Sequence, residues 1–242
     1  MTERLYLKDM YQKEFDATVT KTEGNKIWLD KTAFYPTGGG QPNDTGKLTS
    51  NGKEFKVIDV LKDGDCVTHT LENGDGIKPG DIIKGTINWE KRYAYMKYHT
   101  SIHIFDGIVI SQHASEGLST GSQIYQDRAR IDFDMPQLNK ELAQQILDQT
   151  NKIISEGRRI LVRVVDRDEA LKIPNLVRTE PGRELIKRLD TVRIVEIEGL
   201  DMQMDGGLHV LNSKEIGRLT LSAFTNKGSH SKRVELRIAG GR

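Results

Sequence analysis

A change in hydrophobic periodicity near residue 88 is the feature that most constrains the fold. Before it, apolar and polar residues alternate in short segments separated by turn-forming glycine, asparagine and aspartate. The segments are EFDATVTKTEG, KIWLD, KEFKVIDVLKDG, CVTHTLENG and DIIKGTINW. Short strands at regular spacing are typical of a small antiparallel barrel. We therefore expect a β-barrel domain over residues 1–88.

Beyond residue 88, apolar residues return at helical spacing. The pattern predicts a long helix from Trp89 to about His113, capped by Asn88, and a second helix over residues 137–156. Strands are expected at residues 121–133, 159–165, 191–196, 217–225 and 231–238, the last two as a hairpin. The region 89–242 is thus predicted to be an α+β domain, with helices packed on a mostly antiparallel sheet.

Composition excludes several classes of protein. The chain is 36% hydrophobic and 29% charged, and no apolar run approaches the roughly 20 residues that cross a bilayer, so we expect a soluble protein without a membrane partner. The segment MTERLYLKDM lacks the apolar core of a signal peptide, which predicts a cytoplasmic location. The single cysteine, Cys66, excludes a disulfide framework and any metal site built from cysteines alone.

The net charge of +1 gives no argument for a nucleic-acid partner. Lysine and arginine number 36, against 35 acidic residues, so the field of the whole molecule is close to neutral. A nucleic acid would have to bind a local basic face.

Two pairs of residues suggest a metal site. His99 and His103 are four apart on the predicted long helix and so project from one face. Asp205 and His209 are also four apart, but around Gly206 and Gly207, which favour a tight loop. One carboxylate and three imidazoles make a tetrahedral zinc site. The alternatives are two histidines packed in a core and an ordinary turn rich in aspartate and glycine.

These motifs, taken together, resemble the editing domain of alanyl-tRNA synthetases and their freestanding AlaX relatives. FYPTGGGQPNDTG at residues 34–46 is similar to the glycine-rich motif of the longer AlaX proteins. Arg92, His99, Thr100 and His103 fall where the family has its HTxxH segment. The family segment DxQxCGGTHVxxTxEIG is matched, with Asp201 at its head, by Gln203, Gly206, Gly207, His209, Val210, Glu215, Ile216 and Gly217.

The chain departs from the family pattern at two positions. Asp205 stands where the family has a cysteine ligand, and Leu208 replaces the threonine before the histidine. A carboxylate is an acceptable zinc ligand. It is harder than a thiolate, so cobalt, iron or manganese become credible alternatives to zinc.

The resemblance implies an ATP-independent trans-editing hydrolase that serves translation fidelity. Its substrate would be the acceptor end of tRNA(Ala) carrying a wrongly attached serine, or glycine, and the reaction would be metal-assisted hydrolysis of the ester. The implied zinc ligands are His99, His103, Asp205 and His209. Asp205 and Gln203 are the implied catalytic residues, with Asp205 either a ligand or a base that orients water.

The same resemblance suggests residues that contact the substrate. Thr37 is the candidate for recognising the seryl hydroxyl, because alanine is smaller than serine and cannot be excluded by size. Gly38, Gly39 and Gln41 would line the same pocket. Candidate phosphate contacts are Arg92, Lys97, Lys232 and Arg233, together with Lys91 and Lys227. For each of these the alternative is a surface turn or a solvated charge, and the oligomeric state is left open.

Three other functions compete with editing. A metal-dependent hydrolase of a small ester or amide would act without tRNA. A degenerate, noncatalytic relative would bind tRNA without turnover, as the changes at Asp205 and Leu208 allow. A purely structural role for the histidines would make their loss affect stability alone.

Overall fold

The computed structural model describes residues 1–113, 118–177, 180–228 and 230–240. The chain divides into two compact units, Met1–Tyr95 and Met96–Arg242. The division falls within helix α1 (Trp89–His113), seven residues after the boundary placed by the sequence at residue 88. The Asn88 side chain accepts a hydrogen bond from the Lys91 amide, at 3.2 Å, which is the predicted cap at the start of α1.

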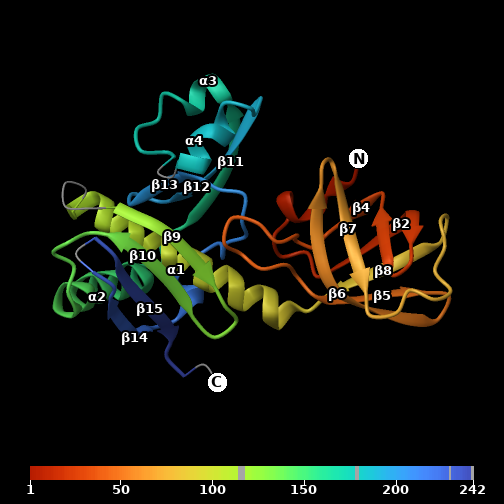
Figure 1. The fold of residues 1–242 in the computed structure, drawn as a ribbon, viewed down its shortest axis with the longest axis horizontal. Helices are drawn as coiled ribbons and strands as arrows, with labels where there is room; N and C mark the ends of the chain where they lie inside the picture. The colour runs from red at the N-terminus through yellow and green to blue at the C-terminus, as the bar shows by residue number, and fades with distance from the viewer. Residues whose placement is uncertain (114–117, 178–179, 229, 241–242) are drawn as a thin grey trace. The chain divides into compact units, whose positions relative to one another are not determined.

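The first unit contains a closed barrel in which every strand pairing is antiparallel (Figure 1). In barrel order the strands are β2 (Glu14–Glu23), β3 (Lys26–Leu29), β7 (Cys66–Leu71), β6 (Lys53–Asp63), β5 (Gly46–Ser50) and β8 (Ile82–Ile87). Outside it, β1 (Glu3–Arg4) pairs in parallel with β4 (Lys31–Thr32), and the short 3-10 helix η1 covers Leu5–Leu7. The predicted barrel is therefore confirmed.

Side-chain alternation fills the barrel. On β2, the buried residues Phe15, Ala17 and Val19 are spaced by two, so one face of the strand points inward. Opposite them on β8, Gly85 leaves the space that the Phe15 ring occupies, since a Cβ at this position would lie 2.3 Å from that ring. A side chain here would displace the core.

The second unit contains a four-stranded antiparallel sheet covered by helices (Figure 1). The sheet order is β14 (Leu219–Asn226), β15 (Lys232–Ile238), β10 (Ala129–Asp134) and β9 (Leu118–Ile124). Helix α1 contacts the sheet through Phe105 and Phe133, whose ring centroids are 5.9 Å apart. Helix α2 (Lys140–Glu156) is bound to β14 by two hydrogen bonds between Asn151 and the Leu219 backbone.

These elements confirm the α+β fold and the terminal hairpin, but one strand prediction was wrong. The segment 121–133 is not a single strand. It forms the hairpin β9–β10, which turns where the Tyr125 amide donates to the Arg128 carbonyl at 2.9 Å.

A separate three-stranded antiparallel sheet accompanies the first in this unit. It consists of β11 (Ile160–Asp166), β12 (Thr191–Ile197) and β13 (Asp201–Met204), in that order. The short helices α3 (Arg167–Ala170) and α4 (Glu180–Ile186) join β11 to β12, and the 3-10 helix η2 (Ser213–Ile216) follows β13. Ala170, Leu176 and Ile186 close a small apolar core against Val192 and Ile194. The sequence did not predict β13, α3 or α4.

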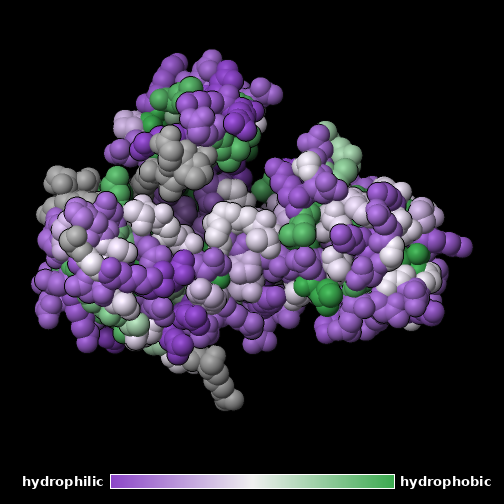
Figure 2. Space-filling view, viewed as in Figure 1, coloured by the Kyte–Doolittle hydropathy of each residue, from purple (hydrophilic) through white to green (hydrophobic). Residues whose placement is uncertain are grey.

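No helix among the described residues is long and apolar enough to cross a membrane. Hydrophilic side chains cover most of the face seen in Figure 2, and hydrophobic residues on it form small separate areas.

Candidate metal centre

Helix α1 provides two of the four residues that meet at the candidate site. Its helical repeat places His99 and His103 one turn apart, with ring centroids separated by 5.1 Å. Both rings are buried, with 5% and 6% of their residue surfaces exposed. Such burial is unusual for an imidazole that has no partner.

The loop after β13 provides Asp205 and His209, as the glycines between them predicted. This loop is fixed at its start, because the Arg193 guanidinium donates to the Asp205 carbonyl at 2.7 Å and the Asp205 amide donates to the Arg193 carbonyl at 3.2 Å. The Gly207 amide donates to Oδ1 of Asp205 at 3.0 Å. One carboxylate oxygen is thereby held, and the other, Oδ2, is directed at the histidines.

The four side chains converge on one point. Oδ2 of Asp205 lies 2.5 Å from Nε2 of His209, 3.4 Å from Nε2 of His99 and 3.6 Å from Nε2 of His103. One ligand atom from each residue falls within 4.8 Å of all the others. The structure therefore brings together the complete set that the sequence suggested as metal ligands.

Burial sets the protonation of this cluster. It lowers the pKa of His99 well below the usual value and the pKa of His209 to about 4. Burial alone would raise the pKa of the Asp205 carboxyl, but the facing His99 and His209 outweigh it and hold that pKa well below its usual range. At neutral pH His99 and His209 therefore present neutral imidazoles and Asp205 presents a carboxylate, which are the forms that bind divalent cations.

The donor set fits a metal ion. A carboxylate oxygen and an imidazole lone pair 2.5 Å apart repel each other unless a cation or a proton lies between them. Three nitrogens and one oxygen within 4.8 Å of one another match a tetrahedral site for zinc or a similar ion.

A second layer of contacts surrounds the cluster. Nδ1 of His209 lies 3.2 Å from the hydroxyl of Thr100, which is completely buried on α1. Nδ1 of His103 is buried and has no hydrogen-bond partner among the described residues. The sequence motif contained Thr100 but gave no sign of its contact with His209, which is 109 residues away.

Gln203, predicted as catalytic, lies on β13 beside two buried carboxylates. Its side-chain amide donates to Oδ2 of Asp201 at 2.7 Å and to Oδ2 of Asp106 at 3.4 Å. Asp106 follows His103 by three residues on α1, and Gln203 precedes Asp205 by two residues on the strand. Helix α1 and β13 therefore run past each other. The candidate metal ligands lie at one end of this crossing, and the hydrogen bonds of Gln203 lie beside them. Sequence reasoning missed Asp106, since no motif includes it.

The glycine-rich motif forms a tight turn in the first unit. Gly38 and Gln41 pair through both backbone hydrogen bonds, and Gly39 and Gly40 have positive φ angles of 58° and 82°. Thr37 is exposed, and its hydroxyl accepts a hydrogen bond from the Asn43 amide at 3.2 Å. Gln41 is buried, so its predicted role in contacting the substrate is not supported by its position.

Two of the predicted phosphate contacts have buried charges. Arg92 has no exposed surface, and its guanidinium binds Asp44 and the backbone carbonyls of Gln12 and Ala33. Lys232 is 5% exposed, and its ammonium donates to the Asn226 side chain at 2.8 Å and to the Gly228 carbonyl at 2.7 Å. Neither group is available to a phosphate.

The other two predicted phosphate contacts are partly accessible. The guanidinium of Arg233 makes two hydrogen bonds to the carboxylate of Asp132, at 2.6 and 2.9 Å, on the outer face of the sheet. Lys97 is half-buried on α1. For Arg233, a phosphate would have to compete with a carboxylate.

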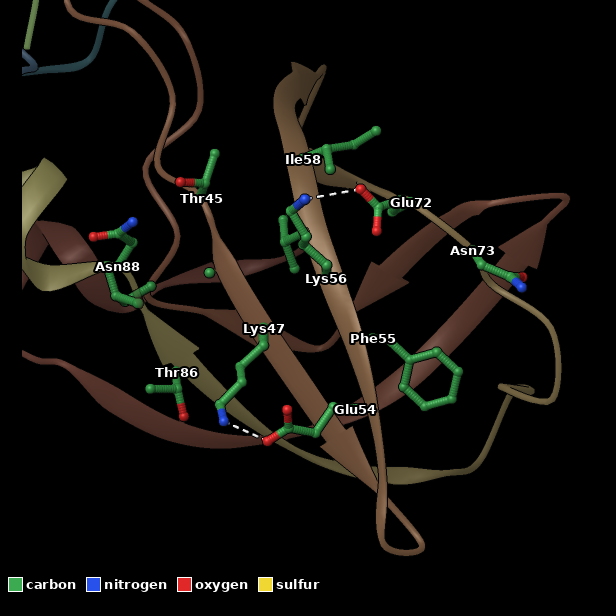
Figure 3. A pocket seen from close by; sticks show the side chains of 13 residues that line it. Thr45, Lys47, Glu54, Phe55, Lys56, Ile58, Glu72, Asn73, Thr86 and Asn88 are labelled. Carbon is green, nitrogen blue, oxygen red and sulfur yellow. Dashed lines mark hydrogen bonds and ion pairs between the residues drawn. The ribbon is translucent and has the colours of Figure 1, made fainter.

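A surface groove of about 720 Å³ lies on the barrel wall in the first unit (Figure 3). Thr45 and Asn88 border it, and the ion pairs Lys47–Glu54 and Lys56–Glu72 lie along it. It contains none of the predicted site residues, and its charges neutralise each other.

Comparison with known proteins agrees with this arrangement. Residues 4–91 match the family model for class II (A) tRNA synthetases, and residues 192–238 match the second additional domain of threonyl and alanyl tRNA synthetases. The chain is 39% identical over 236 residues to the alanyl-tRNA editing protein AlaX-M of Saccharolobus solfataricus, covering 97% of this chain and 98% of that protein. The chain belongs to the AlaX-M family.

Other relatives extend this result. The AlaX-M protein of Methanosarcina mazei is 38% identical over 242 residues, covering 97% of this chain and 95% of that protein. The alanine–tRNA ligase of Ignicoccus hospitalis is 36% identical over the whole of this chain, which corresponds to 26% of that ligase. This chain thus matches about a quarter of the synthetase. It matches nearly the whole of each of the two AlaX-M proteins.

Proposed function

We propose that this AlaX-M protein is a trans-editing hydrolase that removes wrongly attached serine, or glycine, from tRNA(Ala) without ATP. The observation that carries the proposal is the convergence of His99, His103, Asp205 and His209 on one point in a member of this family. Hydrolysis of an aminoacyl ester is favourable in water, so the protein has only to position and activate the reactants.

We propose zinc as the metal, held by Nε2 of the three histidines and Oδ2 of Asp205. When bound, a divalent cation would supply Lewis-acid polarisation of the ester carbonyl or of a water molecule. The aspartate that replaces the family's cysteine keeps the number of ligands at four, which favours an active enzyme over a degenerate relative.

The chain's own residues would hold the reactants. Because the Gly207 amide occupies Oδ1 of Asp205, the carboxylate cannot rotate freely, and Oδ2 stays on the side of the three imidazoles. Gln203 is oriented in a similar way, since its amide nitrogen donates to two carboxylates that can only accept. This leaves Oε1 of Gln203 as the acceptor for a donor such as the amino group of the substrate.

Thr37 is proposed to recognise the seryl hydroxyl. Its side chain is exposed at a turn that Gly38–Gln41 backbone pairing makes rigid, and its hydroxyl can donate to or accept from a substrate oxygen. Alanine has no hydroxyl and would make no hydrogen bond to this group. Discrimination by a missing hydrogen bond succeeds where exclusion by size cannot.

The acceptor end of tRNA(Ala) is the proposed partner. With Arg92 and Lys232 buried, the predicted phosphate contacts that keep exposed surface are Lys91, Lys97, Lys227 and Arg233. Each is expected to contribute modestly, through a salt-dependent attraction.

Deacylation of tRNA(Ala) charged with serine, glycine or alanine tests the proposal directly. The purified protein would be assayed as prepared, after chelation, and after addition of zinc, cobalt or manganese. We expect serine release that chelation abolishes and metal restores, with alanine retained. The matched variants are His103→Ala, which removes a ligand, and His230→Ala, which removes an exposed histidine paired with Asp134.

The outcomes separate the competing functions. Binding of tRNA without turnover under any metal condition would indicate a noncatalytic relative. Hydrolysis of small esters with no activity on charged tRNA would indicate a different hydrolase. Equal activity of His103→Ala and the unaltered protein would overturn the metal mechanism.

A further inference from the structure

The hydroxyl of Thr100 is the centre of a hydrogen-bond arrangement that has one consistent solution. Its oxygen lies 2.9 Å from the Met96 carbonyl, 3.2 Å from the Val210 amide nitrogen and 3.2 Å from Nδ1 of His209. All of these residues belong to the second unit, and Thr100 has no exposed surface. No solvent is available to supply other partners.

Counting protons assigns each contact. A threonine hydroxyl has one proton and accepts two hydrogen bonds. The Met96 carbonyl can only accept, so it takes the hydroxyl proton, and the Val210 amide can only donate. The remaining lone pair of Thr100 must accept from His209, which requires the proton to be on Nδ1. The opposite assignment would leave two oxygens 2.9 Å apart with no proton between them.

We propose that Thr100 is a positioning residue that fixes the tautomer and ring orientation of His209. With its proton on Nδ1, His209 presents the lone pair of Nε2 to the point where His99, His103 and Asp205 converge. The same hydroxyl binds the Val210 amide, so Thr100 also joins the loop that carries His209 to the helix that carries the other two histidines. This inference rests on the metal site of the proposed function and extends it to a residue that does not touch the metal.

The residue type explains why threonine suits this position. The side chain must donate backward to the carbonyl four residues earlier while keeping two lone pairs directed across to the loop. Valine has the same shape without the hydroxyl, and serine keeps the hydroxyl. Removing the hydrogen-bond partner of a metal-bound histidine typically lowers metal affinity by roughly 10- to 100-fold.

The test is zinc affinity, measured on the full chain by competition with a chromophoric chelator. We expect Thr100→Val to bind zinc roughly 10- to 100-fold more weakly and Thr100→Ser to stay close to the unaltered protein. The matched control is Thr150→Val on α2. Thr150 is equally buried and makes the same backward hydrogen bond, to the Ile146 carbonyl at 2.8 Å, but has no hydrogen bond to a histidine among the described residues. It should leave zinc affinity unchanged.

A second measurement needs no variant and so covers the case in which Thr100→Val does not fold. In the zinc-loaded protein labelled with nitrogen-15, long-range proton–nitrogen NMR spectra report which ring nitrogen of each histidine carries a proton. We expect a slowly exchanging proton on Nδ1 of His209. A proton on Nε2 of His209 would overturn the inference.

The remaining results also decide between the claims. Equal zinc affinity of Thr100→Val and the unaltered protein would overturn the role of Thr100 while leaving the metal site intact. If Thr150→Val weakened zinc binding as much as Thr100→Val, the effect would come from helix stability, and the positioning role of Thr100 would also be overturned. Absence of zinc binding by the unaltered protein would overturn both this inference and the metal mechanism.

Discussion

The buried ion pair between Arg92 and Asp44 is predicted to be essential for the stability of the first unit. Both side chains have no exposed surface. The guanidinium donates to Oδ2 of Asp44 through Nε at 3.0 Å and to the Gln12 carbonyl through Nη1 at 3.1 Å, and its Nη2 donates to the Ala33 carbonyl. The Tyr35 amide also donates to Oδ2 of Asp44, at 2.6 Å. The pair therefore fixes both ends of the glycine-rich motif.

Replacing Arg92 with methionine would preserve most of the buried volume but leave a carboxylate and two carbonyls without their donor. Removing one partner of a buried ion pair typically costs about 3–5 kcal/mol. For a unit of this size, urea lowers the free energy of unfolding by about 1–2 kcal/mol per molar. We therefore expect Arg92→Met to lower the urea midpoint by roughly 1.5–5 M. Arg92→Lys should also be destabilised, because one ammonium cannot reach all three acceptors.

Tryptophan fluorescence reports on this unit alone, since the two tryptophans of the chain are Trp28 and Trp89. The control is Lys56→Met, which breaks the exposed ion pair with Glu72 on the same barrel. Its midpoint should move by less than about 0.5 M. An unchanged midpoint for Arg92→Met would refute this reasoning. Weaker tRNA binding at unchanged stability would restore the phosphate contact that the sequence suggested.

Three further predictions concern Asp205, His69 and Thr37. Asp205→Ala should lose zinc affinity by about 100-fold or more, whereas Asp205→Cys should bind cobalt with the intense near-ultraviolet absorption of a thiolate ligand; cobalt spectra without such a band would show that this residue is not a ligand. Burial lowers the pKa of His69 to about 4 in the folded barrel, against an ordinary value of 6.5. The unfolded chain therefore takes up this proton first as the pH falls, and a contribution of about 3 kcal/mol, complete above pH 6.5, is lost between pH 6.5 and 4. As the pH falls from 6.5 to 4, the urea midpoint of His69→Gln should fall less steeply than that of the unaltered protein. Equal slopes for the two proteins would contradict the low pKa assigned to His69. Thr37→Val should reduce kcat/KM for serine release by about 10-fold or more and leave glycine release nearly unchanged, and equal losses on both substrates would exclude recognition of the hydroxyl.

The sequence predicted those parts of the fold and site that depend on local periodicity. Alternation by two residues identified five of the six barrel strands, all but β5, and spacing by four placed His99 and His103 on one face of a helix. Gly206 and Gly207 excluded a helix around Asp205. Each of these follows from the conformational preferences of neighbouring residues.

Features that depend on contacts between distant residues could not be predicted in this way. Arg92 was assigned to the surface because its partner Asp44 is 48 residues earlier, and charge alone does not indicate burial. Lys232 is a different case, since its partners Asn226 and Gly228 are only six and four residues earlier in the same hairpin, and strand alternation gives no sign of such a contact. β13 was missed because its four residues carry no alternation long enough to identify, and its place is fixed by pairing with β12.

The chemical composition of the cluster bears on its behaviour under oxidative stress. Its proposed ligands are three imidazoles and a carboxylate, and the single cysteine, Cys66, lies on β7 in the other unit. Peroxide converts thiolates to sulfenic and then sulfinic acids, and a metal held by a thiolate is lost on that path. A centre without sulfur offers no such atom. The replacement of the family's cysteine by Asp205 thus removes the thiolate through which peroxide would act on a bound metal.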